Sequence, residues 1–564
     1  MPQHADPESA APTCGALARR NLLQAAAAAL VLSGCTPEPQ PAPTPSATAS
    51  SGKPTAAFTF ATAAAPSTLD PAATSDLESW RVTRQVLEGL VEADPTTSEP
   101  APALAVSWKA DDERRVFTFT LRKGVAFHDG TPFNAAAVKA NFDRWFAFTP
   151  AFRSANPTTA FTSVFRAHAD QDELSLFKSC TVLAEDEVRI ELTQPFTAFL
   201  KALTMPAFAI SSPRALARGR ADVLDQRLRS GRVSRYGLHP VGTGPFSFVS
   251  RSEEKVELTA NPRYWGERGQ IAKLSFVVYD TARSRLQALA DGRIDGFDSV
   301  TVDIIDGLVR RGLPIARRDP FSVFYLGMNQ AAAPLQNERI RRAIAAAINK
   351  DAIIRRFYLD DTSSAGQFVP PRLSGFNSSA DFPGFDPERS KRLLAEAGYK
   401  GEELPFCYPL NVSRSYLPTP EKVYAEISAQ LTRVGLNIKP VPIEWSDGYL
   451  QRVTSPGDHA LHLLGINGSA PDPDNFLTTM FGAKNGEFGY FDAQVFSKID
   501  RARQLPDGPE RQEAYLDINR QLATTVPAVP IAYPISAVAT SARVASYPTS
   551  PVLHETFNRV RLNT

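Results

Sequence analysis

The chain of 564 residues has few cysteines, no excess of charge of either sign and no long apolar run. Its four cysteines include no C-x-x-C pair, which excludes a disulfide scaffold and gives no zinc or thiol-redox motif. With 61 basic and 60 acidic side chains and no Lys/Arg run, it lacks the basic face that nucleic acid requires. No stretch reaches the roughly 18 apolar residues of a membrane-spanning helix. We therefore expect a soluble body with several core-forming units and no nucleic-acid partner.

Motifs of common catalytic and metal sites are also missing. The sequence contains no H-E-x-x-H, no G-x-x-x-x-G-K-[ST] and no G-x-S-x-G. His459 and His462 are close in sequence, but the leucines around them predict a buried strand, which would turn the two rings to opposite faces. Asp472 and Asp474 could serve a glycosidase, yet their Asp-Pro-Asp-Asn context favours a turn that caps a helix. We expect no enzyme activity, no metal and no cofactor.

The N-terminus has the pattern of an export signal. Arg19-Arg20 precede an apolar run over 22–32, which ends in the sequence Leu32-Ser33-Gly34-Cys35. A basic start, a short apolar segment and a small-residue cleavage site form a signal peptide, which we place over 1–34. The last four residues resemble the bacterial lipobox, in which the cysteine becomes the lipidated first residue of the mature protein. Residues 18–24 also look like an imperfect twin-arginine signal, so the export route stays open.

A proline-rich segment follows the predicted lipidation site. Residues 36–54 contain six prolines among Ala, Ser and Thr, a composition that cannot build a core. When extended, such a segment rises about 3.1 Å per residue and acts as a semi-rigid spacer. We predict that Cys35 anchors the protein to a membrane by lipid, on the extracytoplasmic face, and that residues 35–55 form its tether.

From residue 56 onward, short strands alternate with helices, which indicates an α/β body. Alternating apolar and polar residues over 116–121 predict a half-buried strand. Apolar residues at helical spacing over 340–350 predict an amphipathic helix, with Arg341 among the basic residues on its polar side. A further helix is expected to begin after an N-cap at Asp386 and to end at Gly398.

Three stretches of the chain carry longer motifs. They contain, in order, FTFTLRKGV at 117–125 and FHDGTPF at 127–133, PVGTGPF at 240–246, NPRYWG at 261–266 and ADGRID at 290–295, and RRAI at 341–344 and DPDNFL at 472–477. Together they resemble the solute-binding proteins of peptide-type ABC importers. That family binds dipeptides, oligopeptides and, in some branches, nickel complexes or haem. The resemblance covers essentially the whole chain after the tether.

The resemblance implies a two-lobed α/β fold of the periplasmic-binding-protein type, with a hinge and an extra domain in lobe one. On this basis lobe one takes 56–320, with outer and inner domains, lobe two takes 321–531, and 532–564 return to lobe one. Solute is expected to bind in the cleft, and hinge closure to bury it. The anchored protein, expected as a monomer, would then deliver the solute to a permease whose ATPase is a separate chain.

The same resemblance indicates where the solute binds. In peptide-binding members, an Asp a few residues before the Asp-Pro turn pairs with the ligand's α-ammonium. Alignment on Asp472 places a serine at that position, and Ile466 stands where the family has an aromatic residue. The predicted ligand-binding residues are Gly465, Asn467, Gly468, Ser469 and Asp472. Alternatively, the alignment shifts locally and Asp472 or Asp474 takes over the ammonium. In either case the resemblance alone does not predict plain dipeptide binding.

The sequence leaves the ligand open. Peptides or peptide-like compounds lead; the alternative is a solute without a free α-amine, such as a modified peptide, an opine-like compound, a metal chelate or an oligosaccharide. A surface-anchored hydrolase would need an acid/base or nucleophile cluster facing the cleft. Cys180 and Cys407 fall in different predicted lobes, where a disulfide would hinder the hinge, so we expect two free, buried thiols.

Overall fold

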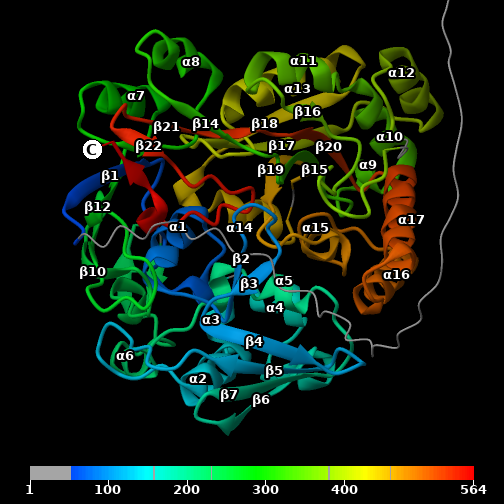
Figure 1. The fold of residues 1–564 in the computed structure, drawn as a ribbon. Helices are drawn as coiled ribbons and strands as arrows, with labels where there is room; N and C mark the ends of the chain where they lie inside the picture. The colour runs from blue at the N-terminus through cyan, green and yellow to red at the C-terminus, as the bar shows by residue number, and fades with distance from the viewer. Residues whose placement is uncertain (1–52, 157–158, 230, 379–381, 458, 564) are drawn as a thin grey trace, which may run out of the picture. The chain divides into compact units, whose positions relative to one another are not determined.

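The computed structural model describes residues 53–563 except 157–158, 230, 379–381 and 458 (Figure 1). The predicted signal peptide, Cys35 and most of the tether lie outside the described residues. Among the helices that are described, none is both long enough and apolar enough to cross a membrane. The described chain forms three larger sheets and three two-stranded ones.

A seven-stranded sheet lies in the N-terminal part of the fold. Its order is β10 (Phe246–Arg251), β11 (Lys255–Ala260), β12 (Ile271–Val278), β1 (Ala56–Thr62), β13 (Gly296–Phe297), β21 (Ser536–Thr540) and β14 (Ile315–Arg318). The strand β1 is parallel to β12 and β13, and the other pairs are antiparallel. The helices of this part are α1 (Leu77–Val86), α7 (Ala282–Ala290) and α8 (Val302–Val309). Two apolar clusters cover the two faces of this sheet.

A four-stranded antiparallel sheet forms a second body, which we call the outer domain. Its order is β4 (Ala105–Ala110), β5 (Val116–Leu121), β7 (Glu187–Leu192) and β6 (Phe177–Ala184). Its helices are α2 (Ala135–Phe146), α3 (Pro150–Ala155), α4 (Phe161–Phe165), α5 (Phe199–Ala202) and α6 (Pro213–Arg218). The prediction of a half-buried strand at 116–121 is confirmed, because Phe117, Phe119 and Leu121 point into an aromatic-rich core while the residues between them are partly exposed.

A six-stranded mixed sheet forms the remaining body. Its order is β16 (Ser363–Ser364), β20 (Ala528–Tyr533), β15 (Ser322–Met328), β19 (Leu461–Asn467), β17 (Glu403–Leu410) and β18 (Asn437–Glu444). The helices around it are α9 (Ala333–Gln336), α10 (Glu338–Ala347), α11 (Lys350–Phe357), α12 (Pro387–Glu396), α13 (Pro420–Arg433), α14 (Tyr449–Thr454), α15 (Pro473–Phe481), α16 (Ala493–Gln504) and α17 (Pro509–Thr525). The two-stranded sheets pair β2 (Val91–Ala93) with β3 (Pro100–Pro102), β8 (Gln226–Leu228) with β9 (Gly231–Val233), and β22 (Val544–Ser546) with β23 (Arg561–Leu562).

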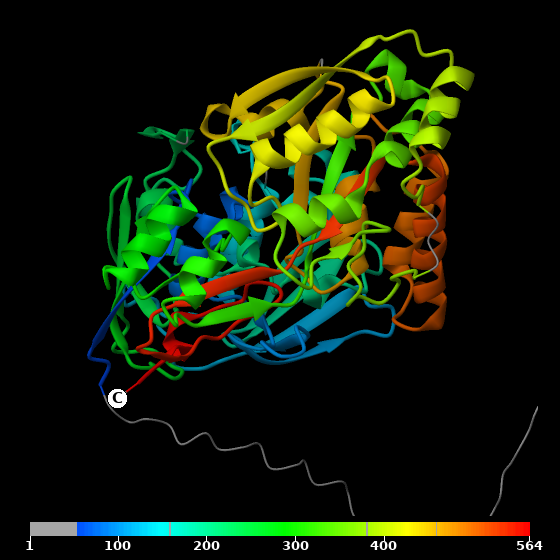
Figure 2. The ribbon, with the colours of Figure 1, turned by 90° about the horizontal axis from the view of Figure 1, so that it is seen from above.

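The chain passes between the seven-stranded and the six-stranded sheet twice, once from β14 to β15 and once from β20 to β21. Figure 2 shows the C-terminal strands returning to the N-terminal part of the fold. The predicted boundaries at 320/321 and 531/532 stay a prediction; β20 itself ends at Tyr533. These two crossings give the fold its two-lobed α/β architecture.

Two of the predicted helices are present, and one of them needs two corrections. The helix α12 follows Asp386, whose side chain accepts from the Arg389 N–H, and Gly398 has a φ of +70° just after its end. The helix α10 buries the expected apolar stripe, but it ends at Ala347, and Lys350 begins the next helix, α11. Placing Arg341 on its polar side was wrong. That side chain is buried, and its guanidinium donates to the main-chain carbonyls of Leu335, Gln336, Thr525 and Val526. Four carbonyl acceptors compensate for the loss of water around the charge.

The structure also tests the predictions for His459 and His462 and for Cys180 and Cys407. His459 lies before the start of β19, so the expected turn of the two rings to opposite faces is wrong: the His459 and His462 ring centroids are 5.2 Å apart. Among the described residues no cluster of His, Cys, Asp and Glu fits a metal ion. Cys180 on β6 and Cys407 on β17 are both buried and form no disulfide, which confirms that prediction.

Candidate ligand cleft

The predicted ligand segment starts at the C-terminal end of β19. The Oδ1 atom of Asn467 accepts hydrogen bonds from the hydroxyls of Ser322 and Ser415, at 2.7 and 2.9 Å. Its amide oxygen is therefore occupied by the protein itself. A Cβ atom at Gly465 would lie 2.4 Å from the Tyr416 ring, so only glycine lets this strand approach that aromatic residue.

The segment then turns between aromatic rings and a helix N-terminus. A Cβ atom at Gly468 would lie 2.1 Å from the ring of Phe321. The next residue, Ser469, is half-buried, and Asn475 in the first turn of α15 holds it in place. The Oδ1 atom of Asn475 accepts from the Ser469 and Ala470 N–H groups at 2.9 and 3.3 Å, and its amide donates to the Ser469 hydroxyl at 3.3 Å. The position thus offers a neutral hydroxyl in a fixed backbone geometry.

Both carboxylates that follow are paired within the protein. Asp472 is 1% exposed, caps α15 through the Asp474 N–H, and forms a two-pronged ion pair with Arg511 at 2.6 and 2.9 Å. Asp474 is also buried and lies 3.0 Å from the Nε atom of Arg503. Burial raises the pKa of Asp474, and the positive charge of Arg503 acts against that rise. The cap confirms the predicted turn. Neither carboxylate is left over as an evident partner for a ligand ammonium.

An arginine that the sequence analysis did not single out lies near this segment. The guanidinium of Arg414 stacks over the ring of Trp445 with its carbon 4.1 Å from the ring centroid. The Nε atom is buried, and within the described part of the chain it has no hydrogen-bond partner. A guanidinium held against an aromatic face and short of acceptors suits a carboxylate or another planar anion.

Arg414 also lines a small cavity where the two lobes meet. The cavity measures about 10 Å³, and its walls come from both lobes and from the second crossing: Ser299, Val300, Thr301, Val302, Phe357, Tyr358, Leu359, Arg414, Ser415, Pro418, Ile535, Ser536 and Ala537. The hydroxyl of Thr301 is buried there without a described hydrogen-bond partner. A space of this size holds about one water molecule, so a solute can enter only if the lobes move apart.

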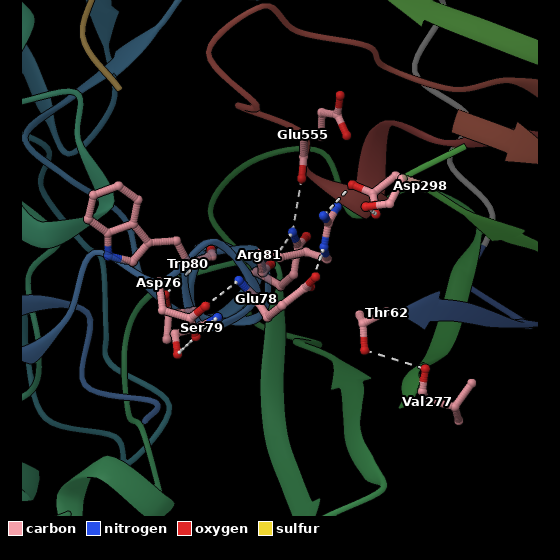
Figure 3. Close-up of polar contacts among 12 residues, drawn as sticks. Thr62, Asp76, Glu78, Ser79, Trp80, Arg81, Val277, Asp298 and Glu555 are labelled. Carbon is pink, nitrogen blue, oxygen red and sulfur yellow. Dashed lines mark hydrogen bonds and ion pairs between the residues drawn. The ribbon is translucent and has the colours of Figure 1, made fainter. Parts of the chain in front are cut away.

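Figure 3 shows a group of polar contacts on and around α1, a helix of the seven-stranded part of the fold. Asp76 caps this helix by accepting from the N–H groups of Glu78 and Ser79. Arg81 lies between the carboxylates of Glu78, at 3.1 Å, and Asp298, with which it also pairs.

The charge network continues toward the first crossing. Arg318 lies 3.5 Å from Asp298 and binds both oxygens of Glu555 at 2.6 and 2.7 Å. Burial opposes ionisation, yet Arg81 and Arg318 hold the pKa of Asp298 below its usual value. Burial raises the pKa of Glu78, and the charges of Arg81 and of Arg414 in the other lobe act against this rise. The charges of the two lobes therefore influence each other across the cleft.

Comparison with known proteins agrees with this architecture. A family model described as bacterial extracellular solute-binding proteins, family 5 middle, matches residues 99–488. The chain belongs to this family of extracytoplasmic solute-binding proteins. It is 30% identical to heme-binding protein A of Haemophilus influenzae, over 96% of this chain and 98% of the relative. It is 28% identical to the dipeptide-binding protein of Escherichia coli, over 84% of this chain and 88% of that one.

Solved structures give the same result. The periplasmic binding protein DppA of Helicobacter pylori, in complex with the peptide STSA, superposes with a TM-score of 0.79 at 26% identity, covering 90% of this chain and 98% of that one. HbpA2 of Haemophilus parasuis superposes with a TM-score of 0.69 at 26% identity, over 90% of this chain and all of that one. The predicted family and the predicted two-lobed fold are confirmed. Relatives of this kind are substrate-binding proteins of ABC importers rather than enzymes.

Proposed function

We propose that this protein is a lipid-anchored, monomeric binding protein that captures a peptide or peptide-like solute between its lobes and delivers it to an ABC permease. Relatives named for dipeptides and a neighbour in complex with a peptide support the solute class. We further propose that the lobes are those assigned from the sequence, and that Gly465, Asn467, Gly468, Ser469 and Asp472 shape the binding site.

One observation gives the proposal its particular form: the segment presents a neutral Ser469, while the two nearby carboxylates already pair with arginines. Charge-assisted hydrogen bonds are worth roughly 1.5–3 kcal/mol net, which is about one to two orders of magnitude in affinity. A zwitterionic dipeptide therefore lacks its usual ammonium partner here, whereas Arg414 can receive its carboxylate. We infer a ligand that has an anionic group and needs no free α-amine, such as an N-blocked peptide.

The same features suit the second candidate, a non-peptide anion such as an opine-like compound, a metal chelate or an acidic oligosaccharide. The relative named for heme, at 30% identity, favours keeping this class. Native mass spectrometry of the protein as purified separates the candidates by the mass of any solute that remains bound. A hydrolase is excluded as long as that solute, and the peptides added later, stay intact on incubation.

Calorimetric titration with matched free and N-acetylated dipeptides tests the role of Ser469. Wild type should bind the free peptide no better than the acetylated one. Ser469→Asp should strengthen only the free peptide, by about 10- to 100-fold, because only the amine gains a partner. Ser107→Asp, on an exposed strand of the outer domain, makes the same charge change and should have no effect. If wild type binds the free peptide tightly and acetylation abolishes this binding, another residue binds the ammonium and Ser469 does not mark a lost anchor.

The lipid anchor is tested separately, because it depends on Cys35 alone. Cys35→Ala should move the protein from the membrane fraction to the soluble fraction, since a single lipidated cysteine is the anchor proposed here. Membrane retention of this variant after a salt wash contradicts the proposal.

Small-angle scattering tests the hinge. Saturation with a bound solute should lower the radius of gyration of any molecules that were open.

A further inference from the structure

The ligand segment lies between the two lobes rather than within one of them. Its strand, β19, belongs to the six-stranded sheet, whereas the side chain of Ala470 is buried in the core of the outer domain. Beyond it, α15 contacts α4 of the outer domain, and Figure 1 shows α15 next to α4 and α5. The position of Ser469 therefore depends on how the outer domain docks against α15.

Arg503 is one of the side chains that make this docking contact from the lobe of α15. Arg503, at the end of α16, is 2% exposed. Its Nε atom lies 3.0 Å from the Asp474 carboxylate within its own lobe, and its Nη2 atom donates to the Val164 carbonyl of the outer domain at 2.7 Å. Its guanidinium also lies over the Phe196 ring, 4.6 Å from the centroid. One guanidinium thus contacts the first turn of α15, the helix α4 and the loop before α5 of the outer domain.

The outer domain makes matching contacts from its own side. Thr197 donates its main-chain N–H to the Arg503 carbonyl at 3.1 Å and its hydroxyl to the Leu505 carbonyl at 2.6 Å. Gln504 donates to Gln194 at 3.2 Å, and Lys201 lies 4.0 Å from the Asp472 carboxylate. All of these contacts join residues of the protein, so they require no solute.

We propose that Arg503 is a positioning residue for solute binding. It holds α15, and through Asn475 the backbone of Ser469, against the outer domain, so that contacts of the protein alone keep the cleft closed in a substantial fraction of solute-free molecules. This inference rests on the proposed function only in calling the cleft a solute site. For a solute to enter, the Arg503 contacts must first break, which lowers its apparent affinity. Once the lobes close again, the same contacts re-form and help to hold the cleft closed around the solute.

The test measures the distance between the lobes in solute-free protein. Nitroxide labels are placed by Lys109→Cys on β4 and Lys422→Cys on α13, both exposed, while the native Cys180 and Cys407 are buried. Bound solute is removed by unfolding and refolding in fresh buffer. Pulsed electron paramagnetic resonance then gives the populations of molecules with short and with long distances between the two labels. This measurement does not require the ligand to be known.

Two variants probe the contact and one serves as control. Thr197→Val removes one hydroxyl and leaves the ion pair of Asp474 intact, so it should fold and raise the ratio of open to closed molecules by about fivefold. Arg503→Met should raise the ratio further. Arg501→Met, on the same helix as Arg503, removes a side chain that is 74% exposed and pairs with Glu510, which is 68% exposed, and it should change nothing.

Each result decides the proposal. It is overturned if the solute-free wild type is almost entirely open, or if Thr197→Val and Arg503→Met lower the melting temperature while the distances stay unchanged. The latter result would assign Arg503 a purely structural role. The proposed function is judged independently by calorimetry. If peptides bind but the variants leave the distances between the labels unchanged, only the positioning role is refuted. If the variants change these distances but no peptide binds, only the solute class is refuted.

Discussion

Removal of Arg511 should destabilise the six-stranded lobe more than almost any other single arginine substitution. Its guanidinium binds both oxygens of Asp472 at 2.6 and 2.9 Å, and the two side chains are 3% and 1% exposed. It also donates to the Ala502 carbonyl and to the Tyr515 hydroxyl. In Arg511→Met, the buried carboxylate keeps the Asp474 N–H, with Lys201 at 4.0 Å.

The magnitude follows from leaving a buried charge without its partner, which costs about 3–5 kcal/mol. For a unit of this size, about 1 kcal/mol shifts the melting temperature by roughly 2–4 °C. Differential scanning calorimetry should therefore show the transition of this lobe lowered by about 6–20 °C. The double variant with Asp472→Asn should recover part of the loss, because a neutral amide still caps α15 and costs less to bury.

A matched control lies on the same helix. Arg520 and Glu513 form an ion pair at 2.8 Å whose side chains are 50% and 62% exposed. Arg520→Met should cost no more than about 1 kcal/mol. The reasoning fails if Arg511→Met lowers the melting temperature no more than Arg520→Met does, or if adding Asp472→Asn to Arg511→Met restores nothing.

Two further predictions concern other parts of the fold. Burial, together with the nearby Arg84, lowers the pKa of His554 to about 4. An unfolded histidine titrates near pH 6.5, so the stability that comes from keeping this ring neutral in the fold is fully present above that pH. This stability is lost as the pH falls toward 4, by about 3 kcal/mol in total. Urea titrations of His554→Gln should show a flatter fall in stability over this range, and parallel curves for the two proteins would contradict it. Gly468→Ala should cost about 1–3 kcal/mol through overlap with Phe321, whereas a methyl group at Gly384 meets open space and should be neutral by the same assay.

The local elements could be predicted because their signals lie within a few residues of each other. The alternation in β5 and the cap at Asp386 are of this kind. Arg341 was misplaced because the carbonyls that receive it, at Thr525 and Val526, come from a segment more than 180 residues further along the chain. No local pattern distinguishes a basic residue that finds such acceptors from one that faces water.

The site followed the same rule. The resemblance predicts that the segment from Gly465 to Asp472 binds the solute, and the structure places this segment at the end of β19 and the start of α15. It could not indicate that Arg511 and Arg503 occupy the neighbouring carboxylates, because both arginines lie on later helices. Arg414 was missed because it lies in a loop without a motif, and what distinguishes it, the face of Trp445, is brought to it by folding.

The place of β21 in the seven-stranded sheet has a consequence for folding. This strand lies between β13 and β14, and it is the sole sheet partner of β14 in the described topology. β14 ends at Arg318 and β21 begins at Ser536, so 217 residues lie between them. Until this long segment has folded and β21 has been added, the sheet has a gap with open strand edges on both sides. The charges of Arg317 and Arg318 on β14 discourage other chains from filling it.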